Sequence, residues 1–306
     1  MLAVIFYWLV NMSIISSVMG LIVLILRRIK RIPRRIVFWL WVAPFMRMVI
    51  PVGIPFQYSI LTLAESISPR LIRSVSVSDE LSSTLNNTIK LADSYRPFLF
   101  SSPGVRHWFA VIACVWLVGV FVLTTFFAFT YVASIRDARK GVHFKDNVYL
   151  SDKVTCPTVY GIVHPRVLIP YSYMDDDFKF ILQHEKSHIR RKDNLWRLFG
   201  VLAVCVHWFN PFSWILLRIF FVDMELACDE DVMKRYTGAE RKKYALTLLA
   251  CTTQSHMLSS TFNGAPIRLR VERIVSYRQI TIVSRICFSA LIMVAIVLMV
   301  TNAALI

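Results

Sequence analysis

Long apolar runs alternate with short charged segments along this chain. Residues 2–26 form an uncharged apolar run, and a helix needs about 20 such residues to cross the hydrocarbon core of a bilayer. Further apolar runs of similar length occupy residues 36–56, 108–134 and 282–306. The pattern therefore predicts four transmembrane helices. The first run lacks a positively charged leader, so we expect it to remain as an uncleaved span.

Basic residues at the ends of these runs predict how the chain is oriented. A dense basic block, residues 27–35, follows the first run, and arginines also follow the third run and precede the fourth. Because positive charge gathers on the cytoplasmic side of membrane proteins, we expect both termini and the serine-rich segment 57–104 to lie outside. This topology accounts for the net charge of +16. The charge therefore does not indicate nucleic-acid binding, for which the chain contains no motif. The membrane domain is expected to comprise residues 1–135.

A fifth apolar stretch, residues 195–222, is interrupted at Asn210 and Pro211. A single crossing here would carry the rest of the chain to the outside. A proline, however, ends or kinks a helix, and the two halves that it leaves are each short for a span. We therefore expect a hairpin that dips into the membrane and returns. Residues 136–281 would then form one cytoplasmic domain.

Short strands are predicted before this hairpin. Residues 148–170 alternate between apolar and polar and contain turn residues, with strands expected at 154–160 and 165–170. Pro165 and Pro170 favour an edge position for the second strand. Such an edge could hold an extended peptide by strand addition, or it could belong to a plain structural hairpin. The predicted fold class is thus an α-helical integral membrane protein with four transmembrane helices and a cytoplasmic α+β domain.

The candidate chemistry lies in residues 184–188, which read H-E-K-S-H and match the pattern H-E-x-x-H. Three aspartates, 175–177, precede this segment's apolar start, as at the amino terminus of a helix. On a helix, His184 and His188 share one face and can bind one zinc ion. Glu185 can then act as general base toward a water molecule that the metal activates. The alternative is a chance grouping within a basic helix.

A second acidic segment could complete a metal site. Residues 224–231 are expected to open the next helix, and Glu225 within them is a candidate third zinc ligand that leaves the fourth position to water. Asp229 follows four residues later on the same face and could hold a ligating imidazole by its other ring nitrogen. An acidic, solvated helix start without a metal is the alternative. No tyrosine or histidine stands out by spacing as a donor to an oxyanion.

Three motifs together resemble a known family. Residues 184–193 (HEKSHIRRKD), 208–214 (WFNPFSW) and 225–230 (ELACDE) are similar to the BlaR/MecR-type membrane zinc metallopeptidases. The resemblance implies a zincin-like metalloprotease domain with Glu185 as the catalytic residue. The implied Zn²⁺ ligands are His184, His188 and Glu225. The resemblance further implies a bacterial cell membrane protein of signal transduction, which cleaves itself, a cytosolic transcriptional repressor, or both, to induce antibiotic-resistance genes.

One departure from the family changes the expected signal. Its antibiotic receptors carry a penicillin-binding sensor domain after the fourth span, whereas this chain ends at Ile306. We therefore expect the protease module without that sensor, and a signal from the outside loop, from a separate sensor protein or homodimer partner, or from the lipid bilayer. Self-cleavage is expected in the polar segment 252–266. The alternatives are a housekeeping HtpX-like membrane protease and a non-catalytic zinc-bound receptor or scaffold.

Overall fold

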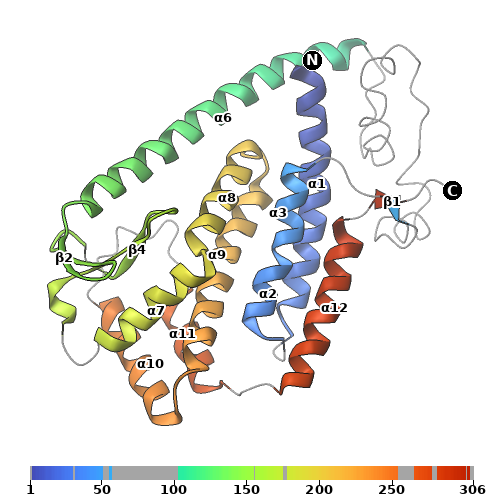
Figure 1. Cartoon of the computed structure of the whole chain (residues 1–306). Coiled ribbons are helices and arrows are strands. Elements are labelled where there is room, and N and C mark those ends of the chain that lie inside the picture. Colours follow the sequence, from blue (N-terminus) through green and yellow to red (C-terminus); the bar gives the residue numbers. More distant parts are fainter. Residues whose placement is uncertain are drawn as a thin grey trace.

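The computed structural model describes residues 2–29, 32–50, 55–56, 103–154, 156–174, 178–253, 265–277, 281–300 and 302–303. Within them the protein is mostly helical, with a four-stranded sheet near one end of the long helix α6 and a two-stranded sheet of residues 55–56 and 302–303 (Figure 1). The helices are α1 (Leu2–Leu26), α2 (Arg34–Leu40), α3 (Val42–Val49), α6 (Pro103–Ala138), a 3₁₀ turn (Tyr171–Tyr173), α7 (Phe178–Arg191), α8 (Asp193–Val206), α9 (Pro211–Met233), α10 (Gly238–Thr253), α11 (Ile267–Val275) and α12 (Ile282–Val300). The strands are β1 (Pro55–Phe56), β2 (Val142–Lys145), β3 (Val148–Leu150), β4 (Thr158–Tyr160), β5 (Arg166–Ile169) and β6 (Asn302–Ala303).

Several predictions fall on parts of the chain outside the described residues. They are the outside loop for residues 57–102, the helix cap at 175–177, and the linker for residues 254–264.

Two of the described helices are long and apolar enough to cross a membrane. They include the segments Ile5–Leu26 of α1 and Ala110–Arg136 of α6. Helix α6 runs along the outside of the bundle, from α1 at one end to the sheet at the other (Figure 1). Apolar side chains such as Phe121 and Phe129 are exposed along it, as on a helix surrounded by lipid. The first and third predicted spans thus correspond to continuous apolar helices.

The second and fourth predicted spans contain shorter helical segments. In residues 36–56, helices α2 and α3 are separated at Trp41. Pro44 cannot donate a backbone hydrogen bond and its ring crowds the carbonyl of Leu40, so the helix is interrupted one turn before the proline. In α12 the apolar stretch is Ile286–Val297. The arrangement with four spans therefore stays a prediction.

Helices α8 and α9 form a hairpin around Asn210 and Pro211, and they pack against each other (Figure 1). Asn210 caps α9, because its side chain accepts a hydrogen bond from the backbone N–H of Phe212 at 2.9 Å. Pro211 stands in the first turn, where no N–H is needed. Gly20 of α1 permits close packing of the hairpin, since a Cβ there would lie 2.4 Å from Leu216 Cδ1. The hairpin thus belongs to the main hydrophobic core, together with α1, α2 and α3.

Helix α9 continues without a break from the apolar hairpin into the acidic segment. The expectation that residues 224–231 open a new helix was wrong, because α9 begins at Pro211 and ends at Met233. No further proline or glycine interrupts the helix, although its neighbours change from apolar to charged side chains. Asp223 and Glu225 are therefore connected rigidly to the hairpin.

The sheet has the strand order β2-β3-β5-β4, with β3 and β5 parallel and the other two pairs antiparallel. Strand β5 is central, so the predicted edge position of residues 165–170 was wrong. Pro165 and Pro170 flank the strand instead of lying within it, and Arg166–Ile169 keep their backbone donors. Helix α7 packs on β4 and β5 through an apolar cluster. This packing positions the helix that carries H-E-x-x-H.

Candidate metal centre

Helices α7 and α9 bring two histidines and one glutamate together. His184 and His188 lie one turn apart on α7, and their Nε2 atoms are 3.1 Å apart. Oε2 of Glu225 lies 3.6 Å from Nε2 of His184 and 3.7 Å from Nε2 of His188. A tetrahedral zinc ion with bonds of about 2.0–2.1 Å holds its ligand atoms about 3.3 Å apart. The spacing of the three donor atoms therefore fits such an ion.

Both histidines can present Nε2 to a metal because their Nδ1 atoms are engaged elsewhere. Nδ1 of His188 lies 2.6 Å from the Asp193 carboxylate. Nδ1 of His184 lies 2.8 Å from the Tyr244 hydroxyl, which donates to Asp229 at 2.6 Å. A hydrogen bond from Nδ1 fixes the tautomer and leaves the Nε2 lone pair free for a metal. Asp229 thus reaches the imidazole through Tyr244, and its own carboxylate lies 3.4 Å from Nδ1.

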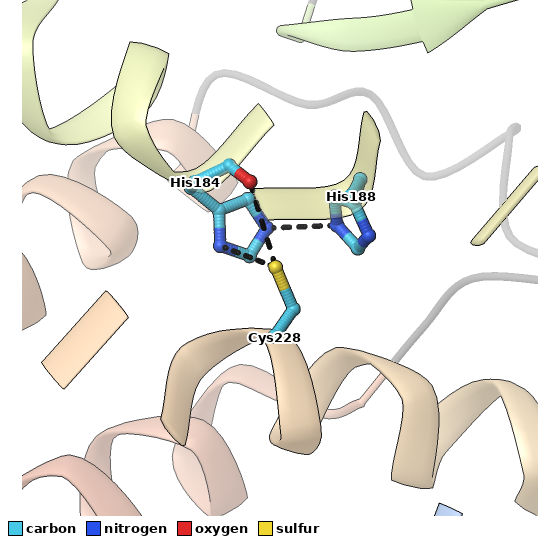
Figure 2. Close-up of side chains that lie close together, drawn as sticks. All are labelled: His184, His188 and Cys228. Atoms are coloured by element: carbon cyan, nitrogen blue, oxygen red, sulfur yellow. Dashed lines mark hydrogen bonds between the residues drawn. The ribbon is translucent and has the colours of Figure 1, made fainter. Parts of the chain in front are cut away.

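Cys228 offers a different third donor beside the histidines (Figure 2). Candidate ligand atoms of His184, His188 and Cys228 lie within 4.8 Å of one another. The sulfur lies 3.6 Å from Nδ1 of His184 and 3.5 Å from the His184 carbonyl oxygen. The thiol thus lies close to Nδ1 of His184, whereas Oε2 of Glu225 lies close to Nε2 of both histidines. Cys228 was missed from the sequence, because a lone cysteine at this position follows no metal-ligand spacing rule.

The buried charges of the site act strongly on one another. Burial by itself lowers the pKa of His184, but Cys228 and Glu225 outweigh it and raise that pKa to about 10. Burial by itself raises the pKa of Glu225, but the two histidines and Arg197 hold it well below its usual value. Arg197 also donates to Oε1 of Glu225 at 2.6 Å. Glu225 is thus held in its ionised form, in which a carboxylate can bind a metal.

Glu185 lies beside His184 on α7 and is 7% exposed. Within the described ranges, no hydrogen bond or ion pair engages its carboxylate. The carboxylate is therefore available to a water molecule or a substrate. This is the position of the general base in an H-E-x-x-H helix.

Helix α11 adds a cation that the sequence did not indicate. Arg270 pairs with Asp229 through two hydrogen bonds, Nε to Oδ2 at 2.8 Å and Nη2 to Oδ1 at 2.7 Å. The same Nη2 lies 3.3 Å from Nε2 of His184, and Nη1 lies 3.8 Å from Oε2 of Glu225. Because α11 follows the linker, no local spacing connects Arg270 with the histidines.

Basic residues from the amino-terminal part of the chain bind the acidic half of α9. The carboxylate of Asp223 is buried and accepts hydrogen bonds from three side chains. These are Arg27, Arg34 and Trp41, at 2.9 to 3.2 Å. Asp231 accepts a hydrogen bond from Ser187 of α7 and pairs with Arg35. The basic block predicted to lie on the cytoplasmic side thus also binds the helix that carries Glu225.

Comparison with known proteins gives one family and two kinds of relative. A family model described as BlaR1 peptidase M56 matches residues 7–274, which include every residue of the site. The chain is 29% identical to the regulatory protein BlaR1 of Bacillus licheniformis over 152 residues, which cover 46% of this chain and 25% of that protein. It is 27% identical to the methicillin resistance mecR1 protein of Staphylococcus aureus strain Mu50 over 106 residues, which cover 33% of this chain and 18% of that protein. The chain thus matches a quarter or less of the length of these relatives.

Proposed function

The chain belongs to the BlaR1 peptidase M56 family, and on this premise we propose that it is a membrane-bound zinc endopeptidase of bacterial signal transduction. The observation that carries the proposal is the convergence of three donor atoms at 3.1 to 3.7 Å, Nε2 of His184, Nε2 of His188 and Oε2 of Glu225. The long apolar helices α1 and α6 support an enzyme held in the cell membrane. In the topology expected from the sequence, its site faces the cytoplasm.

The proposed zinc ligands are His184, His188 and Glu225. Two imidazoles and one carboxylate form a donor set of catalytic zinc sites, with the fourth position left to water. Cys228 is less suitable, because its sulfur faces Nδ1 of His184 and that nitrogen is engaged by Tyr244. Asp193 would hold one imidazole directly, and Asp229 would hold the other through Tyr244.

Glu185 is the proposed general base. When bound, zinc supplies Lewis acidity, which makes a water molecule more acidic and a peptide carbonyl more electrophilic. Glu185 would accept a proton from the water as its oxygen bonds to the carbonyl carbon. The same carboxyl group would then give the proton to the departing amide nitrogen as the C–N bond breaks, so that a carboxylic acid and an amine are formed.

Two substrates are proposed, a cytosolic transcriptional repressor and the chain's own linker, residues 252–266. The relatives are named a regulatory protein and a methicillin resistance protein, which supports a role in the control of antibiotic-resistance genes. The linker joins α10 and α11, and each of these helices contributes a side chain to the site, Tyr244 and Arg270. A segment tethered between them meets the site at high effective concentration.

We further propose four membrane spans with both termini outside. A reporter that is active only outside the cytoplasm should be active when inserted in residues 57–104 or fused after Ile306. It should be inactive when fused after Lys140 or Lys234. An active fusion after Lys234 would mean that residues 195–222 cross the membrane, and the hairpin proposal would then be wrong.

Fragment analysis in bacterial membranes tests the peptidase function. The chain, tagged at both ends and co-expressed with repressor candidates, would be compared with the variant Glu185→Gln. We expect fragments of the chain or of a repressor from the native protein only, while both proteins bind zinc. Lys186→Gln, which changes an exposed neighbour on α7, should cleave as the native chain does.

Two outcomes would contradict this proposal. Equal fragments from the native chain and from Glu185→Gln would exclude Glu185 as the general base. Full signalling by Glu185→Gln without any cleavage would favour a zinc-bound scaffold instead.

A further inference from the structure

We propose that Arg270 stabilises the oxyanion that forms on the scissile carbonyl, an inference that rests on the peptidase function proposed above. The sequence indicated no tyrosine or histidine for this role. The guanidinium of Arg270 reaches the site from α11 and lies beside two of the three proposed metal ligands.

Asp229 holds the Arg270 guanidinium in one orientation. Nε and Nη2 donate to different oxygens of the carboxylate, at 2.8 and 2.7 Å, and a pair of this kind fixes the guanidinium plane. Asp229 is 1% exposed and is itself bound by the Tyr244 hydroxyl. Movement of Arg270 away from this position would leave the buried Asp229 carboxylate without its counter-ion. The guanidinium is thus preorganised before a substrate binds.

The N–H groups that Asp229 does not use face the proposed metal position. A guanidinium carries more N–H groups than the pair with Asp229 engages. Nη2 lies 3.3 Å from Nε2 of His184, and Nη1 lies 3.8 Å from Oε2 of Glu225. These two acceptors are proposed zinc ligands. A bound metal ion would take over the lone pair that Nη2 contacts, and the N–H groups of Arg270 would then be available beside the ion to a carbonyl oxygen that approaches it.

A second arginine pairs with the carboxylate that holds the other histidine. Arg191 supports Asp193, the partner of His188, through a hydrogen bond from Nε at 3.2 Å. Its guanidinium lies over the ring of Phe38, 4.8 Å from the centroid. Each supporting carboxylate of the site thus has its own arginine, but Arg270 also reaches the ligand atoms themselves.

A fixed positive charge beside a divalent cation weakens metal binding, because the two charges repel each other. The same charge favours hydrolysis, because the charge that develops on the carbonyl oxygen in the transition state is negative. The position of Arg270 is therefore unfavourable for a site that only retains a metal and favourable for a site that cleaves peptides.

During hydrolysis, Glu185 takes a proton from the water molecule that attacks the carbonyl. The water oxygen bonds to the carbonyl carbon, and the π electron pair moves to the carbonyl oxygen, which becomes the oxyanion. Arg270 donates a hydrogen bond to this oxygen and keeps its proton. When the pair re-forms the C=O bond, the C–N bond breaks and the nitrogen takes the proton held by Glu185.

Variants of the full-length, zinc-loaded protein test this role. Arg270→Gln removes the charge, Arg270→Lys keeps the charge without the two-point pair, and Arg268→Gln removes an exposed charge from the same helix as control. The probe is a phosphinic dipeptide, whose anionic tetrahedral phosphorus mimics the oxyanion. We expect Arg270→Gln to bind it roughly 100-fold more weakly and to cleave about 10²–10³-fold more slowly than the native chain. Arg270→Lys should recover part of both losses, and Arg268→Gln should match the native chain.

Zinc affinity is a second measurement. In Arg270→Gln it should change in opposite directions for the proposed role and for a merely structural role of Arg270. Loss of a positive charge should leave the zinc affinity of Arg270→Gln at or above the native value. If Arg270 only held Asp229 in place, its loss would lower that affinity by about 10–100-fold. Thermal unfolding in detergent reports whether each variant is folded, and Arg270→Lys carries the test if Arg270→Gln does not fold.

Different results would contradict the role of Arg270 and the peptidase function. Native affinity of zinc-loaded Arg270→Gln for the phosphinic dipeptide would overturn the inference, and so would a native chain that binds zinc but not the dipeptide. A native chain that binds both and cleaves nothing would contradict the peptidase function, while the dipeptide affinities would still decide whether Arg270 binds the anion.

Discussion

At the scale of single residues, the contact between His188 and Asp193 depends on a left-handed residue. Lys192 has a φ of 56° and a ψ of 39°, and it separates the end of α7 from the start of α8. This turn brings the buried Asp193 carboxylate to 2.6 Å from Nδ1 of His188. A left-handed conformation costs a non-glycine residue about 1–2 kcal/mol, so local strain accompanies the contact.

Asp193→Ala should therefore weaken zinc binding. The His188 ring would lose the group that fixes its tautomer, and the loss of such a partner lowers metal affinity about 10–100-fold. Competition with a chromophoric chelator measures the affinity. Asp152→Ala, which removes an exposed carboxylate from the loop after β3, serves as control. Equal zinc affinities in the two variants would contradict a role for Asp193 at the metal.

A pair of variants distinguishes the two candidates for the third ligand. Glu225→Gln should lose most of the zinc affinity, whereas Cys228→Ala should bind zinc nearly as the native chain does, because the nitrogen of His184 that the sulfur contacts, Nδ1, is engaged by Tyr244. Cobalt substitution gives an independent measurement, since coordination by a thiolate adds an intense near-ultraviolet absorption band. Such a band in the native protein, lost in Cys228→Ala, would make Cys228 the ligand.

The sequence could indicate the residues of the site that follow a spacing rule. These residues are His184, Glu185, His188, Glu225 and Asp229. The structure brings four of them together, and Glu185 lies next to His184 on α7. Their chemical roles stay predictions. Tyr244 and Arg270 could not be found in this way, because α10 and α11 bring them to the site by tertiary packing. Asp193 was within reach, since it follows the second histidine by five residues where a basic run ends the helix.

At the scale of elements, the packing of α9 on α1 is tight at Gly20. A Cβ at this position would lie 2.4 Å from Leu216 Cδ1, so Gly20→Ala forces the leucine or the helices to move. Overpacking of this kind costs about 1–3 kcal/mol. Gly20→Ala should therefore unfold at a lower temperature in detergent than the native chain.

Gly238→Ala is the matched control for this substitution. Its added Cβ would meet no atom within 4 Å at the start of α10, so the variant should unfold as the native chain does or slightly later. An unchanged midpoint in Gly20→Ala would mean that Leu216 moves, or that α1 and α9 separate, at little cost.

The elements that could be predicted are those whose ends are set by the backbone geometry of a particular residue, such as a proline. Pro211 ends one helix and begins another by its own geometry, so the hairpin was visible in the sequence. The central position of β5 was not visible, because it depends on pairing with β3 on one side and with β4 on the other. The supposed helix start near Asp223 failed for a related reason. A change from apolar to acidic residues alters the partners of a helix and leaves its backbone unbroken.

At the scale of the whole molecule, Asp223 connects the amino-terminal helices to the metal site. Its carboxylate binds Arg27 at the end of α1, Arg34 in α2 and Trp41 between α2 and α3. Glu225 follows on the same helix. The position of the proposed ligand is therefore fixed relative to α1 and α2.

Asp223→Ala should destabilise the protein strongly. Two arginines would lose their buried partner, and removal of one member of a buried ion pair costs about 3–5 kcal/mol. Unfolding in detergent measures the change, with Asp152→Ala as the exposed control. A loss below about 1 kcal/mol, the size expected of a surface pair, would mean that this network does not hold the helices together.

The order of α10 and α11 along the chain limits how long a self-cleaved enzyme could work. Helix α10 ends at Thr253 and α11 begins at Ile267, so the histidines and Arg270 lie on opposite sides of the linker. A cut between them would divide one catalytic centre between two polypeptides. Helix α11 would then stay in place through noncovalent contacts, including those of Ile274 in the apolar cluster with α9 and α10. The activity of such an enzyme would be lost at the rate at which the carboxy-terminal fragment, which carries α11, dissociates.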